Sequence, residues 1–216
     1  TEIYTLSLHD ALPIWLRILQ AAGEVFADKG FHEATHADIC RRAAANTAAI
    51  NYHFGDKEGL YRAVWQNTVE LMAGLYPADG GAAADEPAPL RLERFVKTML
   101  GKMTAAGALG HSHRLHLQEM HHPTGIVDDL LAQGHEPYRA YLRAILRELL
   151  GPQASDRTVA CCEVSVIGQV RAFRHGLHKP PFAKPPHVGA KQIDQLAAHI
   201  ARFSLAGIAA IRRTND

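Results

Sequence analysis

Residues 18–64 read ILQAAGEVFADKGFHEATHADICRRAAANTAAINYHFGDKEGLYRAV, and this stretch decides the fold. Between Trp15 and Lys29, apolar residues recur every three or four positions, which predicts an amphipathic helix. Gly30 follows directly, as a glycine that ends a helix does. The first element of this stretch is therefore a helix that buries one face.

Two shorter helices follow. Thr35 can cap the second helix, and Asp38 three residues later completes a near capping box. After a break at residues 44–46, a third helix is predicted from Thr47 to Phe54. Three short helices with a tight break between the second and third form a helix-turn-helix. In that motif one helix braces against the phosphate backbone and the next enters the major groove.

A helix that enters the major groove needs small or polar side chains on its exposed face. Residues 47–49 are Thr-Ala-Ala, and such small side chains let a helix sit deep in the groove. Asn51 can pair with adenine or bind a phosphate, and Tyr52 and His53 can donate to phosphate oxygens. Lys57 lies in the first turn of the next helix, whose free N–H groups also favour anions. We expect DNA contacts from Thr35, Arg42, Asn46, Thr47, Ala48, Ala49, Asn51, Tyr52, His53 and Lys57.

Positive charge is not in excess in this part of the chain. Residues 17–75 hold six Lys/Arg and seven Asp/Glu, a net charge of −1. Attraction to DNA then depends on where single cations lie, and Arg41, Arg42 and Lys57 are the candidates near the third helix. Arg41 and Arg42 could equally be solvated, and Asn51 could equally be an ordinary surface residue.

The same stretch resembles the N-terminal DNA-binding domain of the TetR family of bacterial regulators. The matching landmarks are AA…VFA…KGF, T…DI…RA, and NYHF followed by a Lys-Glu helix start. The stretches HRLHLQEM (113–120) and LLGPQASDRTVACCEVSVIGQ (149–169) are similar to the C-terminal domain of the CecR branch, and AINYHFG is typical of that branch. The resemblance implies an all-helical homodimer that represses transcription until a small molecule binds its C-terminal domain.

The chain departs from the family pattern at two positions. Relatives usually carry glycine in the turn where this chain has Ala44. If that residue needs a positive φ, alanine costs on the order of 1 kcal/mol. Relatives often carry lysine where this chain has Thr47, so one phosphate contact is expected to be missing.

The remaining sequence predicts a larger helical domain. The chain has 216 residues, 7% of them aromatic, and few runs of β-branched residues, which favours an all-α fold. Residues 76–89 hold three prolines and two glycines and read as a flexible linker. We expect a helix-turn-helix domain at 15–56, a connecting helix at 57–75, the linker at 76–89, and a ligand-binding and dimerisation domain at 90–213. Helices within that domain are predicted at 90–106, 111–121, 124–134, 136–150, 156–175 and 190–213.

Residues 1–14 read TEIYTLSLHDALPI and resemble the translation of a widely used sequencing-library adapter. A segment of that origin has no role in the fold, because nothing selected it to pack on the domain. We therefore expect the native sequence to begin near Trp15 or Leu16.

Apolar side chains on the predicted second-domain helices are candidates for an effector pocket. Phe95, Met99 and Met103 recur every four residues, and methionine adapts to varied ligands. Glu119 lies among apolar residues of the next helix, where a carboxylate could recognise a cation or a donor group. We expect ligand contacts from Phe95, Met99, Met103, Leu115, Glu119, Met120, Gln169 and Phe173. Each of these residues could also serve simply as core.

Histidines at positions 111, 113, 116, 121 and 122 surround Glu119. Glu119 and His122 have the i, i+3 spacing of one half of a di-iron site, but this domain offers no second half. We therefore expect a polar helix with neutral histidines, no metal site and no catalytic residues. A metal-dependent enzyme built on residues 111–122 stays open as an alternative.

The last two predicted helices have the composition of a dimer interface. Their apolar stripes are wide enough to be buried on two sides, one within the chain and one across a two-fold axis. A four-helix bundle from two chains would result. The interface candidates are Val159, Val166, Val170, Ile193, Leu196, Ile200, Phe203, Gly207 and Ile211. The same residues could instead only close the core of one chain.

Composition narrows the function further. A net charge of +1 argues against a polybasic tail protein, and no apolar run reaches the roughly 18 residues that span a membrane. Three cysteines without a CxxC pair argue against a disulfide framework and favour a reducing cytosol. We expect a non-enzymatic repressor in the bacterial cytoplasm that needs no cofactor and binds double-stranded operator DNA and a small-molecule effector. A helical interaction module that does not bind DNA is a further alternative.

Overall fold

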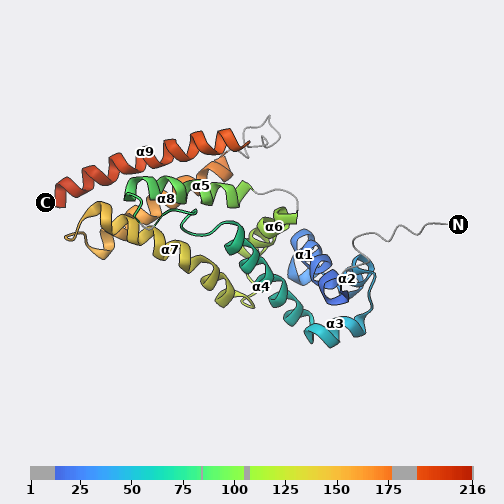
Figure 1. The fold of residues 1–216 in the computed structure, drawn as a ribbon. Coiled ribbons are helices and arrows are strands. Elements are labelled where there is room, and N and C mark those ends of the chain that lie inside the picture. Colours follow the sequence, from blue (N-terminus) through green and yellow to red (C-terminus); the bar gives the residue numbers. More distant parts are fainter. Residues whose placement is uncertain (1–12, 84, 105–107, 177–188, 216) are drawn as a thin grey trace. The chain divides into compact units, whose positions relative to one another are not determined.

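The computed structural model describes residues 13–83, 85–104, 108–176 and 189–215. Within these ranges the chain is all-α (Figure 1). The elements are α1 (Ile14–Glu33), α2 (His36–Ala43), α3 (Thr47–Phe54), α4 (Lys57–Leu75), α5 (Ala88–Thr104), α6 (Ala108–His121), α7 (Asp128–Leu150), α8 (Asp156–Gly176) and α9 (Ala190–Asn215). Of the first fourteen residues, only Pro13 and Ile14 lie in the described part, and Pro13 precedes the first turn of α1.

The helices form two compact units. Unit 1 lies within Thr1–Leu71 and Ala106–Ala132, and unit 2 within Met72–Ala105 and Gln133–Asp216. The division by packing therefore places α6 with the helix-turn-helix, although the sequence groups it with the second domain. The loop between α4 and α5 contains turns at residues 78–81, as its prolines and glycines predict.

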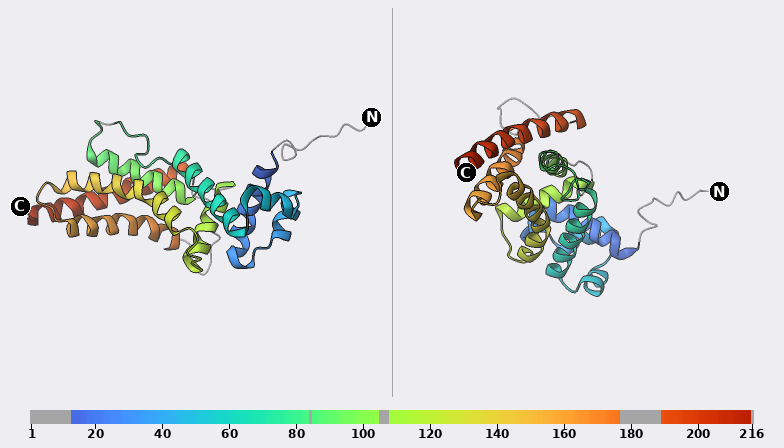
Figure 2. Two further views of the ribbon diagram at one scale, coloured as in Figure 1. Left: turned by 90° about the horizontal axis from the view of Figure 1, so that it is seen from below. Right: turned by 60° about the vertical axis from the view of Figure 1, so that its left-hand side comes forward.

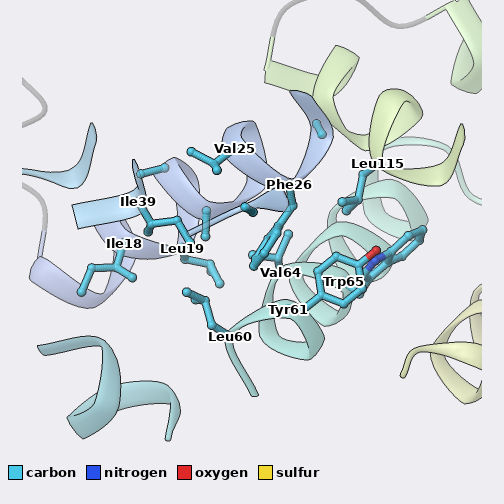
Figure 3. Packing of buried hydrophobic residues seen from close by; sticks show 14 of the residues in the cluster. Ile18, Leu19, Val25, Phe26, Ile39, Leu60, Tyr61, Val64, Trp65 and Leu115 are labelled. Atoms are coloured by element: carbon cyan, nitrogen blue, oxygen red, sulfur yellow. The ribbon is translucent and has the colours of Figure 1, made fainter. Parts of the chain in front are cut away.

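The core of unit 1 is formed by α1 together with residues of α2, α3, α4 and α6. Ile18 and Phe26 of α1 are fully buried, and Phe26 makes an edge-to-face contact with Tyr61 of α4 at 4.8 Å between ring centroids. Leu115 brings α6 into the same cluster (Figure 3). α2 and α3 contribute one or two buried residues each, so α1 and α4 form the base on which the short helices rest.

Unit 2 is built from α5, most of α7, α8 and α9. In both views of Figure 2, α9 runs beside α5 and α8, in agreement with the contacts between these helices. Its core contains Phe95 of α5, Leu142 and Ile145 of α7, Val166 of α8 and Ile200 of α9, all nearly or fully buried. Burial of aliphatic side chains from four helices is the main source of stability for such a bundle.

The sequence predicted separate helices at 124–134 and 136–150, and this was wrong. A single helix, α7, runs through Pro137. Proline removes one backbone hydrogen bond and costs about 3 kcal/mol inside a helix, so the pattern alone favoured a break. Burial of Tyr138, Leu142 and Ile145 just beyond the proline offsets this cost.

Candidate nucleic-acid interface

The turn between α2 and α3 is fixed by side-chain caps and one strained residue. Thr35 caps α2 by accepting a hydrogen bond from the Asp38 N–H at 3.1 Å, which confirms the predicted cap. Asn46 caps α3 by accepting from the Ala49 N–H at 2.9 Å. Between them, Ala44 adopts φ 47° and ψ 49°, the left-handed conformation that favours glycine. The turn therefore keeps the geometry of a helix-turn-helix at the expense of strain in one alanine.

α3 exposes the face that would enter a major groove. Ile50 is the buried residue of this eight-residue helix. Tyr52 is 85% exposed, and its ring meets the exposed His53 ring at 4.9 Å. Thr47, Ala48 and Asn51 are also exposed, so five of the predicted contact residues share an open surface on α3. Ala49 is half-buried and packs against the core instead.

The close approach of the end of α3 to the first turn of α4 requires a glycine, Gly59, that the sequence analysis did not single out. Asp56 caps α4 by accepting from the Gly59 N–H at 2.7 Å. A Cβ atom at Gly59 would lie 2.1 Å from the Phe54 carbonyl oxygen, far inside contact distance. Glycine at this position therefore lets the end of α3 approach the first turn of α4. The Lys-Glu-Gly start of α4 was the signal that could have identified it.

Two predicted phosphate-binding cations are held by partners within the chain. Arg42 lies in ion pairs with Glu24 and Asp28 of α1. The Lys57 ammonium donates to the His32 carbonyl oxygen at 3.2 Å and lies 4.7 Å from the centroid of the Phe31 ring. Both side chains would have to leave or share these contacts to bind phosphate.

Arg41 is more available to a ligand. Its side chain is largely exposed and lies 3.5 Å from one carboxylate oxygen of Asp38. Asp38 is already engaged, because Lys29 and Thr35 both donate to it and hold its pKa at about 2. Arg41 therefore joins the exposed α3 residues as a candidate DNA contact, whereas the contacts expected from the sequence included Arg42 and not Arg41.

The residues predicted for an effector pocket fall in both units. In unit 2, Phe95 is core, and Met99 and Met103 are half-buried against that core. Gln169 donates to the Ser204 hydroxyl at 3.1 Å, which links α8 to α9. The side chain of Phe173 lies outside the described part of the structure.

The predicted pocket residues on α6 belong to unit 1. Leu115 is buried in the core, whereas Met120 is 56% exposed and does not lie on the same buried face of α6. Glu119 is buried, and its carboxylate accepts hydrogen bonds from the Tyr61 hydroxyl at 2.7 Å and from the N–H and hydroxyl of Thr124 at 2.7 and 2.9 Å. Glu119 thus ties α6 to α4, and its acceptors are already engaged.

Burial of Tyr61 and its hydrogen bond to Glu119 raise the pKa of the tyrosine hydroxyl, which a competing interaction with Trp65 opposes only in part. The hydroxyl therefore stays protonated and donates a hydrogen bond to the carboxylate. The neighbouring histidines do not converge on Glu119 in a metal site. No group of three or more His, Cys, Asp or Glu residues with that geometry occurs in the described residues.

Four of the predicted interface residues lie in the core of the single chain. Val159, Val166, Val170 and Ile200 are almost fully buried, and Ile193 and Leu196 pack against the same core. Only Phe203, Gly207 and Ile211 of the predicted set are exposed. In the single chain, the predicted residues of α8 lie in the core, whereas those of α9 divide between the core and the exposed surface.

Comparisons with known proteins agree with this geometry. Residues 18–64 match the family model of the bacterial regulatory proteins of the tetR family. Residues 88–208, more than half of the chain, match the C-terminal domain of the HTH-type transcriptional dual regulator CecR. None of the described helices is both long and apolar enough to cross a membrane.

Individual relatives match over different lengths. The HTH-type transcriptional regulator UidR of Escherichia coli K12 is 40% identical over 55 residues, which span 26% of this chain and 28% of UidR. The chain thus covers little more than a quarter of the first curated relatives. The dual regulator CecR of Shigella flexneri is 25% identical over 169 residues, 74% of this chain and 75% of CecR.

A solved structure supports the fold along most of the chain. The transcriptional regulator FadR from Bacillus subtilis, in complex with stearoyl-CoA, is 15% identical with a TM-score of 0.63. The match covers 89% of this chain and 98% of FadR. Together with the helix-turn-helix geometry and the two family matches, this similarity leads to one assignment. The chain belongs to the TetR family of helix-turn-helix transcriptional regulators and carries a CecR-type C-terminal domain.

Proposed function

We propose that this chain is a transcriptional repressor that binds a near-palindromic operator as a homodimer and leaves it when a small molecule binds among the C-terminal helices. The observation that carries the proposal is the face of α3 on which Thr47, Ala48, Asn51, Tyr52 and His53 are exposed in the described part of the chain. Small and hydrogen-bonding side chains on a capped helix suit a major groove. Arg41 adds an exposed cation beside this face.

Exposed apolar residues of unit 2 support a homodimer. Val164 of α8 and Phe203 and Ile211 of α9 are large, apolar and exposed. Large apolar side chains exposed on two helices that contact each other suit an interaction site. A second copy of the chain is the natural partner, since a dimer would present two α3 helices to successive major grooves about 34–36 Å apart.

The effector is proposed to bind within unit 2. Met99 and Met103 lie on α5 and Gln169 lies on α8. A molecule bound beside them would change how these helices pack. FadR of Bacillus subtilis, which shares this fold, binds stearoyl-CoA. Ligand and operator would then be linked through one conformational equilibrium, in which each lowers the affinity for the other.

Selection of bound duplexes from a random DNA pool tests the proposal. We expect the selected sequences to share two inverted half-sites, and sedimentation to find two chains on each duplex. Recovery of duplexes without a common motif, or of one chain per duplex, would contradict the proposed mode of action.

A further inference from the structure

Lys102 differs from the other cations of α5. The other three lie in ion pairs: Arg91 with Glu148, Arg94 with Glu86, and Lys97 with Asp194. Lys102 has no carboxylate within ion-pair distance among the described residues. Its ammonium instead lies 4.0 Å from the centroid of the Tyr138 ring on α7. An aromatic face attracts a cation but does not neutralise it.

Basic residues surround His135 of α7, and Lys102 is one of them. His135 and Arg139 lie on α7, one on either side of Tyr138, and Arg171 lies on α8. The pKa of His135 is lowered, first by burial and then by the charges of Lys102, Arg171 and Arg139. We refer to Lys102, His135, Arg139 and Arg171 as the basic cluster.

The nearby carboxylate does not balance the basic cluster. Glu163 of α8 accepts from Arg139 at 3.0 Å and from Arg143 at 2.6 Å. One carboxylate is thus shared between two guanidinium groups. Among the described residues, no ion pair joins Lys102 or Arg171 to this or any other carboxylate.

Lys102 keeps most of its charge in this setting. Burial lowers the pKa of its ammonium to about 8, so the group is still mainly protonated near neutral pH. A half-buried cation without a counter-ion is unfavourable, and a bound anion would relieve this cost. The apolar side chains of Met99 and Met103 lie beside Lys102 on α5, and the buried Tyr138 ring lies opposite.

We propose that the basic cluster binds the anionic group of the effector, and that the effector is an organic acid with an apolar body. Lys102 provides the main charge for the carboxylate, sulfonate or phosphate, while Met99, Met103 and Tyr138 contact the apolar body. This inference rests on the proposed function only where it identifies the ligand as the effector. The binding site itself is independent of DNA.

Three ligands with the same alkyl chain test this site. Decanoate, decan-1-ol and decylamine present an anion, a neutral group and a cation, and calorimetric titration of the full chain gives each Kd. We expect decanoate to bind about tenfold more tightly than decanol, since one charge-assisted contact is worth at least about 1.4 kcal/mol. Lys102→Met should abolish this preference. Lys97→Met, a matched change on the same helix, should retain it.

Lys102→Arg keeps the charge and should keep most of the preference, so it separates loss of charge from loss of folding. Equal binding of decanoate and decanol by the unmodified chain would overturn the proposal. So would an unchanged preference in Lys102→Met, or no decanoate binding at all. These titrations contain no DNA. A chain that prefers decanoate through Lys102 but binds no operator would retain this site and lose the repressor function.

Discussion

At the scale of single residues, Ala44 in the turn of the helix-turn-helix adopts a backbone conformation that is strained for alanine. Its φ of 47° lies in the left-handed region, and it is the one non-glycine residue with positive φ in the described part of the chain. The resemblance to the family predicted the turn at this position, and it also predicted that an alanine with positive φ would be strained there. Local turn chemistry is readable from sequence because it depends on neighbours along the chain.

Ala44→Gly should therefore stabilise the protein by about 1 kcal/mol, because glycine adopts this conformation without a clash. For a chain of this size the melting temperature should rise by about 2–4 °C. Calorimetry checks the shift. Ala73→Gly, an exposed position inside α4, provides the control and should lower stability, because glycine is a poor helix former. An Ala44→Gly protein less stable than the parent would refute the account of the turn.

Gly59→Ala should have the opposite effect. Its Cβ would meet the Phe54 carbonyl oxygen at 2.1 Å, so α3 or the first turn of α4 must shift. We expect a loss of about 1–3 kcal/mol and weaker DNA binding, measured by calorimetry and fluorescence anisotropy. Gly74→Ala on the same helix meets nothing within 4 Å and should cost nothing. If Gly59→Ala matched the parent in stability and DNA affinity, the close approach of α3 to α4 would not depend on this glycine.

At the scale of elements, α2, α3 and their caps followed from periodicity and capping residues. The first helix did not end at Gly30 as expected, because α1 continues to Glu33 beyond a kink at this non-helical glycine. The role of Glu119 did not follow from these signals either. Its hydroxyl donor, Tyr61, lies 58 positions away in the sequence, so only packing brings the two together. Sequence alone could recognise Glu119 as an acid among apolar residues, and this pattern suits a ligand contact as well as an internal hydrogen bond.

Tyr61→Phe tests the tie between α4 and α6. The variant keeps the ring and, among the described residues, leaves the buried carboxylate with the N–H and hydroxyl donors of Thr124. We expect a loss of about 1–3 kcal/mol, because a buried charged acceptor has lost a hydrogen bond. Denaturant unfolding gives the difference. Tyr52→Phe, at an exposed ring, should leave stability unchanged, and a Tyr61→Phe protein that matches it would show that the bond contributes nothing.

At the scale of the whole molecule, the sequence assigned one broad stripe on α8 and α9 to both core and interface, and periodicity cannot divide the two. The structure divides them for a single chain: Ile200 is buried, whereas Phe203 is 66% exposed. Both lie on the same helix three residues apart, so they make a matched pair for testing the proposed dimer.

Phe203→Asp should keep the fold and lose the dimer, because a carboxylate at an apolar interface opposes association. Ile200→Asp should unfold unit 2, since a buried unpaired carboxylate costs several kcal/mol. Sedimentation and circular dichroism distinguish the two outcomes. A Phe203→Asp protein that sediments as a dimer at the same concentration as the parent would exclude Phe203 from the interface.

The central claim is that the exposed face of α3 binds duplex DNA, and Ala48→Glu tests it most directly. Ala48 is exposed on α3, so a glutamate there should leave the melting temperature unchanged within about 1–2 °C. It would place a carboxylate against the bases and phosphates of the groove. Ala144→Glu, at an exposed position of α7, is the matched control.

The measurement is the affinity for the duplex selected from the random pool, by fluorescence anisotropy at fixed salt. We predict that Ala48→Glu weakens binding by at least about 100-fold, equivalent to about 2.7 kcal/mol, and that Ala144→Glu binds as the parent does. An Ala48→Glu protein that is folded and binds this duplex with the affinity of the parent would contradict the assignment of α3 as the DNA-reading helix.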